Sequence, residues 1–398
     1  MKIAIISAGR LPVPATKGGA VETKLDYILA YNATHHLHDI TMYSICPDKK
    51  QYIIPYTKEN HYYHINNQSL FFKIGKKIYN YFNNAAYYDS SIEYFLFLCL
   101  RHIRNQQYDV IITTNRPGYT QKIAQTTQTP IILQLNNDYL NPNLKNASKT
   151  KELCSGIITC SHYINKRAAS VTCNKDIPVI TVHNGIDISR FVHAQPISRT
   201  NLGLIDDDFV IVFSGRVIKE KGVLELIKAI KLIDDIKTIK LLIIGASFYG
   251  TDNCISAYMR ELKNEAETVK DKVIFTGYVN YADIPAYLKV ADVAVIPSVW
   301  DEPFGLTVLE SMAAGLPLIT TRGGGIPEIC EDTAILIDRE NIIQNIANAI
   351  RVLYNNPKNK NSLGKKAQER SWLFDKDIFS KSYLEAVKAI VNNHRKGI

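Results

Sequence analysis

Two carboxylates in the C-terminal half of the chain, Glu302 and Glu310, are separated by seven residues and follow a short apolar strand pattern. A proline and a glycine between them disfavour a helix at Glu302, so we expect this glutamate on a loop after the strand. A helix can begin near Leu306, which places Glu310 about one turn inside it. The N–H groups of residues 305–308 then form a helix N-terminus, which attracts an anion such as phosphate. The pattern predicts a nucleotide-sugar site, with phosphate on the amides and hydroxyls on the acids.

Two cations, Arg216 and Lys221, follow another apolar run, Val210–Ser214, and are flanked by glycines that keep the chain uncrowded. An arginine binds phosphate oxygens through a planar fork and a lysine binds them as a point charge. Together they are suited to neutralise a leaving diphosphate. A solvated surface loop is the alternative, but the position after a strand favours a functional role.

Glycines stand at three further strand ends. Gly18 and Gly19 precede a helix pattern, and residues 323–325 are all glycine, so both segments permit close backbone approach to a ligand. A flexible turn without a ligand is the alternative for the first pair. Tyr278 and Val279 follow a third strand, where the backbone is placed to hydrogen-bond a base; simple packing is an equal alternative.

Composition limits the class of protein. The chain has 398 residues, 46% hydrophobic and 21% charged, which predicts two domains of a globular enzyme. A net charge of +9 suits anionic small molecules, membranes or nucleic acid and selects none of them. The seven cysteines lack a Cys-x-x-Cys spacing, which favours a reducing cytosol. The N-terminus lacks a signal-peptide pattern, and the longest apolar run, near 94–100, is far below the ~20 residues that span a membrane.

The elements that must position these residues follow a β-α-β-α pattern. Short β-branched runs alternate with helical spacing, as in Val223–Ile233 and Tyr281–Lys289, and this predicts two doubly wound α/β domains with a polar break near 191–204. Ligands of such sheets bind beyond the carboxyl ends of the strands. The predicted strands are Ile3–Ser7, Ile40–Ser44, Val110–Thr113, Ile131–Leu135, Gly156–Cys160 and Val179–Val182, then Val210–Ser214, Lys240–Gly245, Val273–Gly277, Val293–Ile296, Leu318–Thr320 and Ala334–Ile337.

The segment 71–82 contains three lysines, no acidic residue and several aromatic residues. As a helix it would align Phe71, Ile74, Ile78 and Phe82 on one face. Such a helix either rests on an anionic membrane surface or packs on the sheet, and we expect the packed arrangement.

Taken together, these motifs resemble the retaining glycosyltransferases of the GT-B fold, family 4, over essentially the whole chain. The likeness implies two Rossmann-like domains facing across a cleft. It assigns 1–195 to acceptor binding, 196–375 to the nucleotide sugar, and 376–398 to a helix that crosses back onto the N-terminal domain. The start of the chain looks like the spore-coat and surface-polysaccharide branch. The matching motifs are Gly18-Gly19, residues 182–187, Gly215-Arg216 with Lys221, residues 275–277, the Glu302–Glu310 segment and Gly324–Glu328.

The resemblance also implies roles for the site residues. Arg216 and Lys221 would stabilise the departing diphosphate, Glu310 would accept hydrogen bonds from the ribose hydroxyls, and Glu302 would orient the donor sugar. The acceptor would attack the face from which the nucleotide leaves, without either glutamate as a general base. No metal or other cofactor is implied. The remaining implied donor contacts are the amides of Phe304, Gly305 and Leu306, the helix start at Thr307 and Val308, the loop residues Gly18 and Gly19, and Tyr278 with Val279.

One position departs from the family pattern. After the fourth predicted strand many relatives carry a histidine facing the donor sugar, whereas this chain has Asn136, with Asp138 two residues on. An amide hydrogen-bonds a hydroxyl but does not shuttle protons. Three interpretations are possible. Asp138 takes the role of the histidine, the leaving phosphate accepts the proton of the acceptor hydroxyl, or the alignment of this segment with the family is shifted by a residue or two.

The sequence therefore predicts a metal-independent hexosyltransferase, or N-acetylhexosaminyltransferase, that uses a nucleotide-diphosphate sugar, UDP-linked by preference. The expected acceptor is a saccharide, a lipid-linked glycan or a surface glycan. The expected location is the cytosol, and the alternative is the inner face of the membrane with contact through 71–82. Nucleic acid is not an expected partner. The alternatives are a nucleotide-sugar 2-epimerase of the same fold and a catalytically silent coat or scaffold protein.

Overall fold

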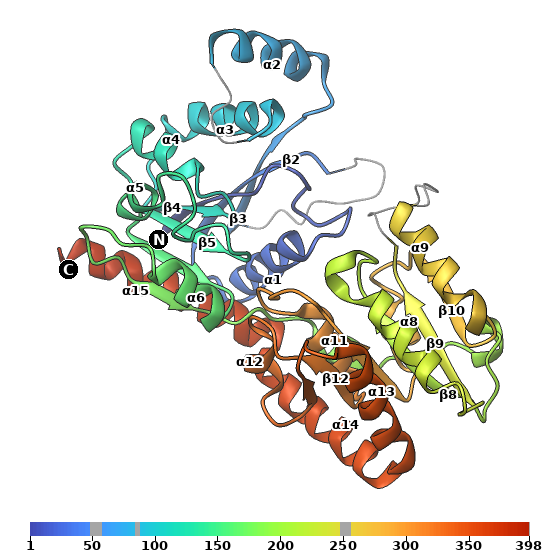
Figure 1. The fold of residues 1–398 in the computed structure, drawn as a ribbon. Helices are drawn as coiled ribbons and strands as arrows, with labels where there is room; N and C mark the ends of the chain where they lie inside the picture. Colours follow the sequence, from blue (N-terminus) through green and yellow to red (C-terminus); the bar gives the residue numbers. More distant parts are fainter. Residues whose placement is uncertain (48–57, 84–87, 247–255, 398) are drawn as a thin grey trace. The chain divides into compact units, whose positions relative to one another are not determined.

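A computed structural model of the chain describes residues 1–47, 58–83, 88–246 and 256–397 (Figure 1). The chain divides into two compact units: unit 1 is Met1–Gly185 with Lys376–Ile398, and unit 2 is Ile186–Asp375. The division falls at Gly185, so the boundary that the sequence placed at residue 195 lies inside unit 2. Residues 376–398 are part of unit 1.

Unit 1 contains a seven-stranded sheet in the order β3-β2-β1-β4-β5-β6-β7, and every pairing is parallel. Along the central strand, Ile3 and Ile5 face one core cluster while Ala4 and Ile6 face the other. Burial on both faces explains why this strand is apolar from Ile3 to Ile6. The strands are β1 (Lys2–Ile6), β2 (Asp39–Ile45), β3 (Asn60–Ile65), β4 (Val110–Thr114), β5 (Ile131–Leu135), β6 (Gly156–Thr159) and β7 (Val179–Thr181).

Helices cover both faces of this sheet (Figure 1). Leu25 and Ile28 of α1 share one core cluster with Tyr383 and Val387 of α15, while Phe95 of α3 belongs to the cluster on the opposite face. The Tyr383 hydroxyl also donates to Gln134 Oε1 at 3.1 Å, which ties α15 to β5. The helices are α1 (Ala20–His35), α2 (Leu70–Phe82), α3 (Ser90–Ile103), α4 (Tyr119–Thr126), α5 (Ala147–Glu152), α6 (His162–Ala169) and α15 (Lys376–Arg395).

Unit 2 contains a six-stranded parallel sheet in the order β10-β9-β8-β11-β12-β13. Its strands are β8 (Phe209–Ser214), β9 (Ile239–Ile244), β10 (Val273–Gly277), β11 (Val293–Ile296), β12 (Leu318–Thr321) and β13 (Ile335–Ile337). Its helices are α7 (Ile188–Val192), α8 (Val223–Leu232), α9 (Ala257–Ala266), α10 (Ile284–Leu288), α11 (Leu306–Ala313), α12 (Ile326–Cys330), α13 (Ile342–Asn355) and α14 (Pro357–Ser371), with short 3₁₀ turns at Arg199–Leu202, Lys219–Lys221, Glu267–Val269 and Trp372–Phe374.

Strand β3 is absent from the sequence-based prediction. Its segment, Asn60–Ile65, is made of polar and aromatic residues except for the final isoleucine, and the positions between its two ends are partly or fully exposed. It forms the edge of the sheet beside β2. An edge strand needs fewer apolar residues, so it lacks the β-branched run that marks the other strands. The twelve predicted strands are all present, with ends shifted by a residue or so.

Each sheet has one point where the strand order reverses. In unit 1 the point lies between β1 and β4, and in unit 2 between β8 and β11. Open parallel sheets bind ligands beyond the carboxyl ends of the strands at such a point. Arg216 follows β8 and Glu302 follows β11, so the fold brings these two predicted site residues to the reversal point of unit 2. In the described part of the chain, no helix has the length and apolar character needed to cross a membrane.

Candidate active site

Two glycine contacts hold the strand-end loops of unit 2 together. A Cβ added at Gly222 would lie 2.0 Å from the Pro297 carbonyl oxygen, and the φ of Gly222 is +72°. A Cβ at Gly245 would lie 1.9 Å from the Gly215 carbonyl oxygen. Only glycine permits both backbone approaches. The first contact brings the loop after β8 against the loop after β11.

This approach pairs Lys221 with Glu302. The lysine Nζ lies 2.6 Å from Glu302 Oε1, and the Ser298 hydroxyl donates to the same oxygen at 2.6 Å. The lysine side chain is 11% exposed and the glutamate side chain 6% exposed. The glycine run after β12 fixes the backbone of Glu302. Gly325 donates its N–H to the Glu302 carbonyl at 2.8 Å, and a Cβ at Gly324 would lie 2.1 Å from the same oxygen.

The N-terminus of α11 stands beside the loop after β8. Its N-cap is Gly305, with φ +113°, and the helix begins at Leu306 as the sequence predicts. A Cβ placed on Gly215 would contact the Thr307 side chain at 3.5 Å, so the β8 loop lies against the first turn of α11. Arg216, the next residue of that loop, is exposed. A helix N-terminus next to an exposed guanidinium is a favourable place for an anion.

Glu310 lies in α11 and is 6% exposed. Burial raises the pKa of this carboxyl to about 7, against the lowering effects of a hydrogen bond from Tyr281 and the charges of Arg190 and Lys221. Arg190 in turn donates to the Tyr281 carbonyl and stacks on its ring at 4.3 Å. Sequence reasoning missed Tyr281 and Arg190, because neither stands in a motif or at the end of a strand.

Tyr278 and Val279 follow β10, two strands from β8. Tyr278 is 44% exposed and Val279 is partly exposed. The preceding carbonyl, that of Gly277, accepts a hydrogen bond from the Gly245 N–H at 3.0 Å. The ends of β10, β9 and β8 are therefore in contact through Gly277, Gly245 and Gly215.

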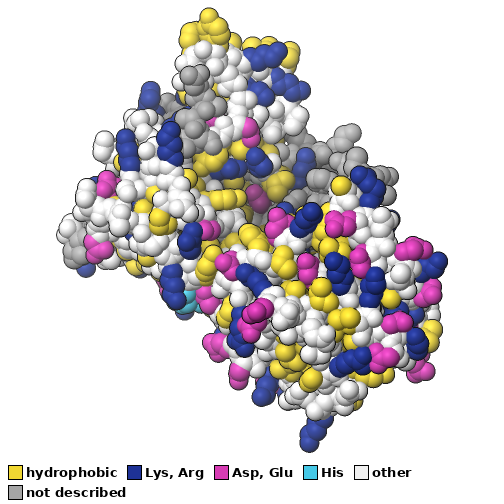
Figure 2. Space-filling model, viewed as in Figure 1, with side chains coloured by type: hydrophobic (Ala, Val, Ile, Leu, Met, Phe, Trp, Pro, Cys, Tyr) yellow, Lys and Arg dark blue, Asp and Glu magenta, His cyan; other side chains and the backbone are white. Residues whose placement is uncertain are grey.

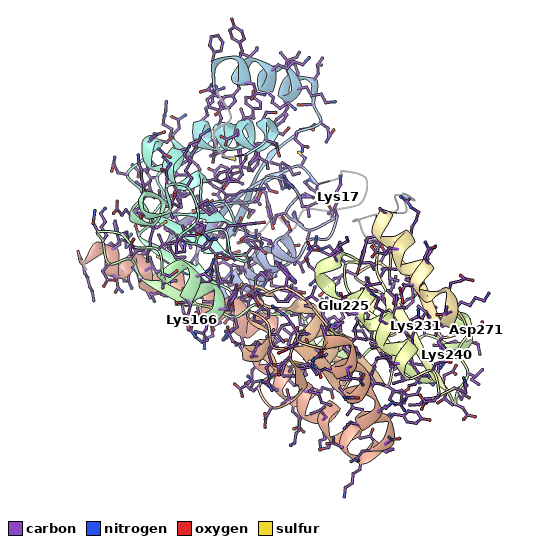
Figure 3. All side chains as sticks on the ribbon, viewed as in Figure 1. Lys17, Lys166, Glu225, Lys231, Lys240 and Asp271 are labelled. Atoms are coloured by element: carbon purple, nitrogen blue, oxygen red, sulfur yellow. The ribbon has the colours of Figure 1, made fainter. Side chains whose placement is uncertain are left out.

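In unit 1 the predicted glycine pair precedes α1. Gly19 is the N-cap, with φ +109°, and a Cβ there would lie 2.4 Å from Glu22 Oε2. The close approach at Gly19 is thus to a carboxylate of its own helix. A Cβ at Gly18 would meet no atom within 4 Å, and the exposed Lys17 precedes it (Figure 3).

The structure separates Asn136 from Asp138. Asp138 forms an ion pair with Arg167 at 2.9 Å and accepts a hydrogen bond from Asn141 at 3.2 Å. Asn136 is 8% exposed, and its backbone N–H donates to Asn115 Oδ1 at 2.7 Å. The two residues therefore have different partners.

A buried lysine, which the sequence analysis did not identify, holds Asn136. Lys24 of α1 is 3% exposed and donates to the side-chain oxygens of Asn136 and Asn184, the latter at 2.6 Å. Burial lowers the pKa of Lys24 to about 8, although Cys160 and Glu22 raise it. Within the described ranges, Asn136 Nδ2 has no hydrogen-bond partner. The ammonium and this amide are N–H donors suited to an oxygen ligand beside the ends of β5 and β7.

The chain resembles known glycosyltransferases in sequence. Residues 194–370 match the family model described as "Glycosyl transferases group 1". Spore coat protein SA of Bacillus subtilis is 28% identical over 92% of this chain and 93% of that protein. The putative glycosyltransferase YtcC of the same organism is 26% identical over 93% of this chain and 87% of that protein. An uncharacterized glycosyltransferase of Methanocaldococcus jannaschii, MJ1607, is 32% identical over 63% of this chain and 56% of that protein.

Solved structures share the fold. Sucrose-phosphate synthase from Thermosynechococcus elongatus superposes with a TM-score of 0.74 at 19% identity, covering 98% of this chain and 99% of that one. Anabaena HepE in complex with UDP superposes with a TM-score of 0.73 at 18% identity, covering 98% and 100%. Two doubly wound parallel-sheet units define the class as the GT-B fold.

The enzyme class that these matches support is that of the glycosyltransferases. The matched residues 194–370 contain the Lys221–Glu302 pair and the α11 N-terminus.

Proposed function

We propose that the protein is a retaining glycosyltransferase that moves a hexose or N-acetylhexosamine from a UDP-linked donor to a saccharide, lipid-linked or surface-glycan acceptor. The observation that carries the proposal is the nearly buried Lys221–Glu302 pair beside the N-terminus of α11, at the reversal point of the unit 2 sheet. Lys221 and Glu302 balance each other's charge, so the α11 N-terminus and the exposed Arg216 supply the net positive charge at the place where open parallel sheets bind ligands.

The donor diphosphate is assigned to Arg216, Lys221 and the first turn of α11. Arg216 is exposed and available to form a bidentate contact, while the Glu302 contact fixes the position of the Lys221 ammonium. Both cations stabilise the charge that develops on the leaving diphosphate. Because these groups supply the positive charge, the proposal includes no metal ion.

Sugar and nucleoside are assigned to neighbouring groups. Glu302, with the backbone amides of residues 304–306, orients the hydroxyls of the transferred sugar. Glu310, held by Tyr281, accepts hydrogen bonds from the ribose hydroxyls. Thr307 and Val308, in the first turn of α11, are assigned to donor binding at the helix start. Tyr278 and Val279 are assigned to the nucleotide base. In unit 1, the backbone at Gly18 and Gly19 is assigned to the donor phosphate.

The acceptor proton is assigned to the leaving phosphate. Asp138 is engaged by Arg167 and Asn141, so we assign it a positioning role. Asn136 and Lys24 present N–H donors and are assigned to a sugar hydroxyl. Attack on the face from which the diphosphate leaves places the acceptor hydroxyl next to a departing phosphate oxygen, which then accepts the proton and gives retention.

The names of similar proteins support this choice of donor and acceptor. Anabaena HepE has been solved with UDP and with UDP-glucose. A Salmonella typhimurium protein that is 27% identical over 34% of this chain is named lipopolysaccharide 1,2-N-acetylglucosaminetransferase. Cys99, Cys154, Cys173 and Cys330 are free thiols, which suits a reaction in the cytosol.

The test is a donor screen followed by product analysis. UDP-, GDP-, dTDP- and ADP-sugars are compared by thermal shift, because a ligand that binds the folded state raises the apparent stability. The stabilising donor is then incubated with saccharide and lipid-linked acceptors, with and without EDTA, and the anomeric configuration of the product is read by NMR. We expect a product that retains the donor configuration and is unaffected by EDTA.

Three outcomes contradict the proposal. An inverted product would overturn the retaining mechanism. Isomerisation of the free donor without an acceptor would indicate the 2-epimerase reaction. Nucleotide binding without transfer or hydrolysis from any donor would indicate a silent coat or scaffold protein.

A further inference from the structure

Helix α2 packs on the rest of unit 1 through one narrow face. Phe72 contacts Tyr94 of α3 with ring centroids 5.0 Å apart, and Tyr79 lies 5.1 Å from Phe97. A Cβ at Gly75 would lie 2.0 Å from the Tyr94 hydroxyl oxygen, so the two helices approach closely there. The Ser69 side chain caps the helix by accepting the Phe72 N–H at 3.1 Å. The helix is therefore formed and anchored.

The remaining large apolar side chains of α2 are exposed to solvent over about half of their surface or more. At 3.6 residues per turn they fall within about a third of the helix circumference, on a side that excludes Phe72 and Tyr79. Phe71 is 89% exposed, Tyr81 85% and Phe82 76%. Six of the sixteen exposed large hydrophobic residues in the described chain lie on this one helix (Figure 2): Leu70, Phe71, Ile74, Ile78, Tyr81 and Phe82.

This finding corrects a prediction from the sequence. The expected arrangement packed the face of Phe71, Ile74, Ile78 and Phe82 on the sheet, and that expectation is wrong, because all four side chains are exposed. The packing face is instead formed around Phe72, as described above. We call the six exposed side chains the apolar face of α2.

Positive charge borders the apolar face. Lys73 and Lys77 are exposed, and Lys76 donates to Ser91 Oγ at 3.2 Å. The sequence of α2 contains no acidic residue. The helix thus joins aromatic and aliphatic side chains to a cationic edge, the combination found in helices that lie in the plane of a lipid headgroup layer.

We propose that α2 is a docking helix that lays its apolar face into the surface of an anionic lipid bilayer, with its lysines on the acidic headgroups. Charge complementarity selects this occupant. A second copy of the chain, placed with α2 against α2, would bring two cationic edges together, and like charges across an interface oppose association. This proposal concerns binding and does not depend on which sugar is transferred, so it stands or falls separately from the proposed reaction.

Vesicle flotation of the full chain tests the proposal. Vesicles of phosphatidylglycerol and phosphatidylcholine are compared with vesicles of phosphatidylcholine alone. We expect flotation with the anionic vesicles that weakens as salt is raised, because each lysine near the surface adds to the attraction and salt screens it. Equal binding to both vesicle types, or none to either, would overturn the proposal.

Two variants with matched controls locate the binding surface. The Phe71→Ser/Tyr81→Ser/Phe82→Ser variant removes apolar side chains that are already exposed, so we expect it to fold and to lose at least about tenfold in vesicle affinity. Its control, Ile205→Ser/Leu373→Ser, removes side chains of unit 2 that are 63% and 59% exposed and leaves vesicle binding unchanged. The Lys73→Glu/Lys77→Glu variant loses at least about tenfold in affinity for anionic vesicles. Its control, Lys145→Glu/Lys166→Glu, makes the same charge change at two other exposed lysines of unit 1, of which Lys166 is labelled in Figure 3, and loses much less.

The competing occupant gives a different result. If the apolar face bound a second copy, the native chain would elute as a dimer without lipid, and the triple serine variant as a monomer. That pair of elution volumes would overturn the membrane assignment, as would a triple serine variant that floats as well as the native chain.

Discussion

At the scale of single residues, each unit holds buried charged side chains near the ends of its strands. Lys221 and Glu302 neutralise each other, Glu310 is held by Tyr281, and Lys24 is held by amide oxygens. Sequence spacing identified Lys221, Glu302 and Glu310 as candidates, because they follow strand patterns. It did not identify Lys24, whose partners come from the ends of distant strands and whose own position inside a helix carries no motif.

The pKa of Glu310 makes the first residue-scale prediction. Its carboxyl has a pKa of about 7 in the folded chain against 4.5 in the unfolded chain. Between these values the folded state binds more protons, so the free energy of unfolding falls as pH rises from 4.5 through 7, by about 3 kcal/mol in total. Urea unfolding across this range measures the slope, and Glu310→Gln removes this contribution.

Ligand binding by Glu310 has the opposite dependence on pH. Two ribose hydroxyls donate best to the ionised carboxylate, so the affinity for UDP-glucose, whose diphosphate does not titrate near neutrality, falls below pH 7 by at most about tenfold per pH unit. Calorimetric titration of UDP-glucose at several pH values measures this affinity. The account of Glu310 is wrong if native protein and Glu310→Gln show the same pH profile.

At the scale of elements, glycines decide how the strand-end loops meet. The alternation of apolar runs predicted twelve strands, and the glycine at 305 predicted the start of α11. The sequence did not predict β3, which is polar, or the orientation of α2, because helical periodicity identifies an apolar face but does not say what covers it. The sequence also does not say which backbone atoms lie close to each glycine. In the structure, Gly222 lies against the Pro297 carbonyl.

Gly222→Ala tests that contact at the element scale. Gly222 and Gly203 share nearly the same φ, +72° and +70°, but an added Cβ at Gly203 meets no atom within 4 Å. Gly203→Ala should therefore cost only the strain of positive φ, about 1 kcal/mol. Gly222→Ala should cost at least about 2 kcal/mol more in the free energy of unfolding, because the loops must separate. Equal costs in urea unfolding would show that the loops do not approach as described.

At the scale of the whole molecule, the two sheets supply two reversal points, and the fold class followed from the sequence pattern. The order of the strands did not, because parallel pairing depends on long-range contacts and not on local spacing. That order places the loops after β8 and β11 side by side, although Lys221 and Glu302 are 81 positions apart in the sequence. The central claim is that this place binds the diphosphate of a nucleotide sugar.

Calorimetric titration of UDP and of uridine into native protein, Arg216→Ala and Lys219→Ala tests this claim most directly. Arg216 and Lys219 are exposed cations in the same loop, so neither change should unfold the chain. We predict that Arg216→Ala weakens UDP binding by at least about tenfold, the loss expected for a charge-assisted hydrogen bond. Uridine binding should not change, and Lys219→Ala should have little effect. Undiminished UDP affinity in Arg216→Ala, or equal losses for the two variants, would contradict the account.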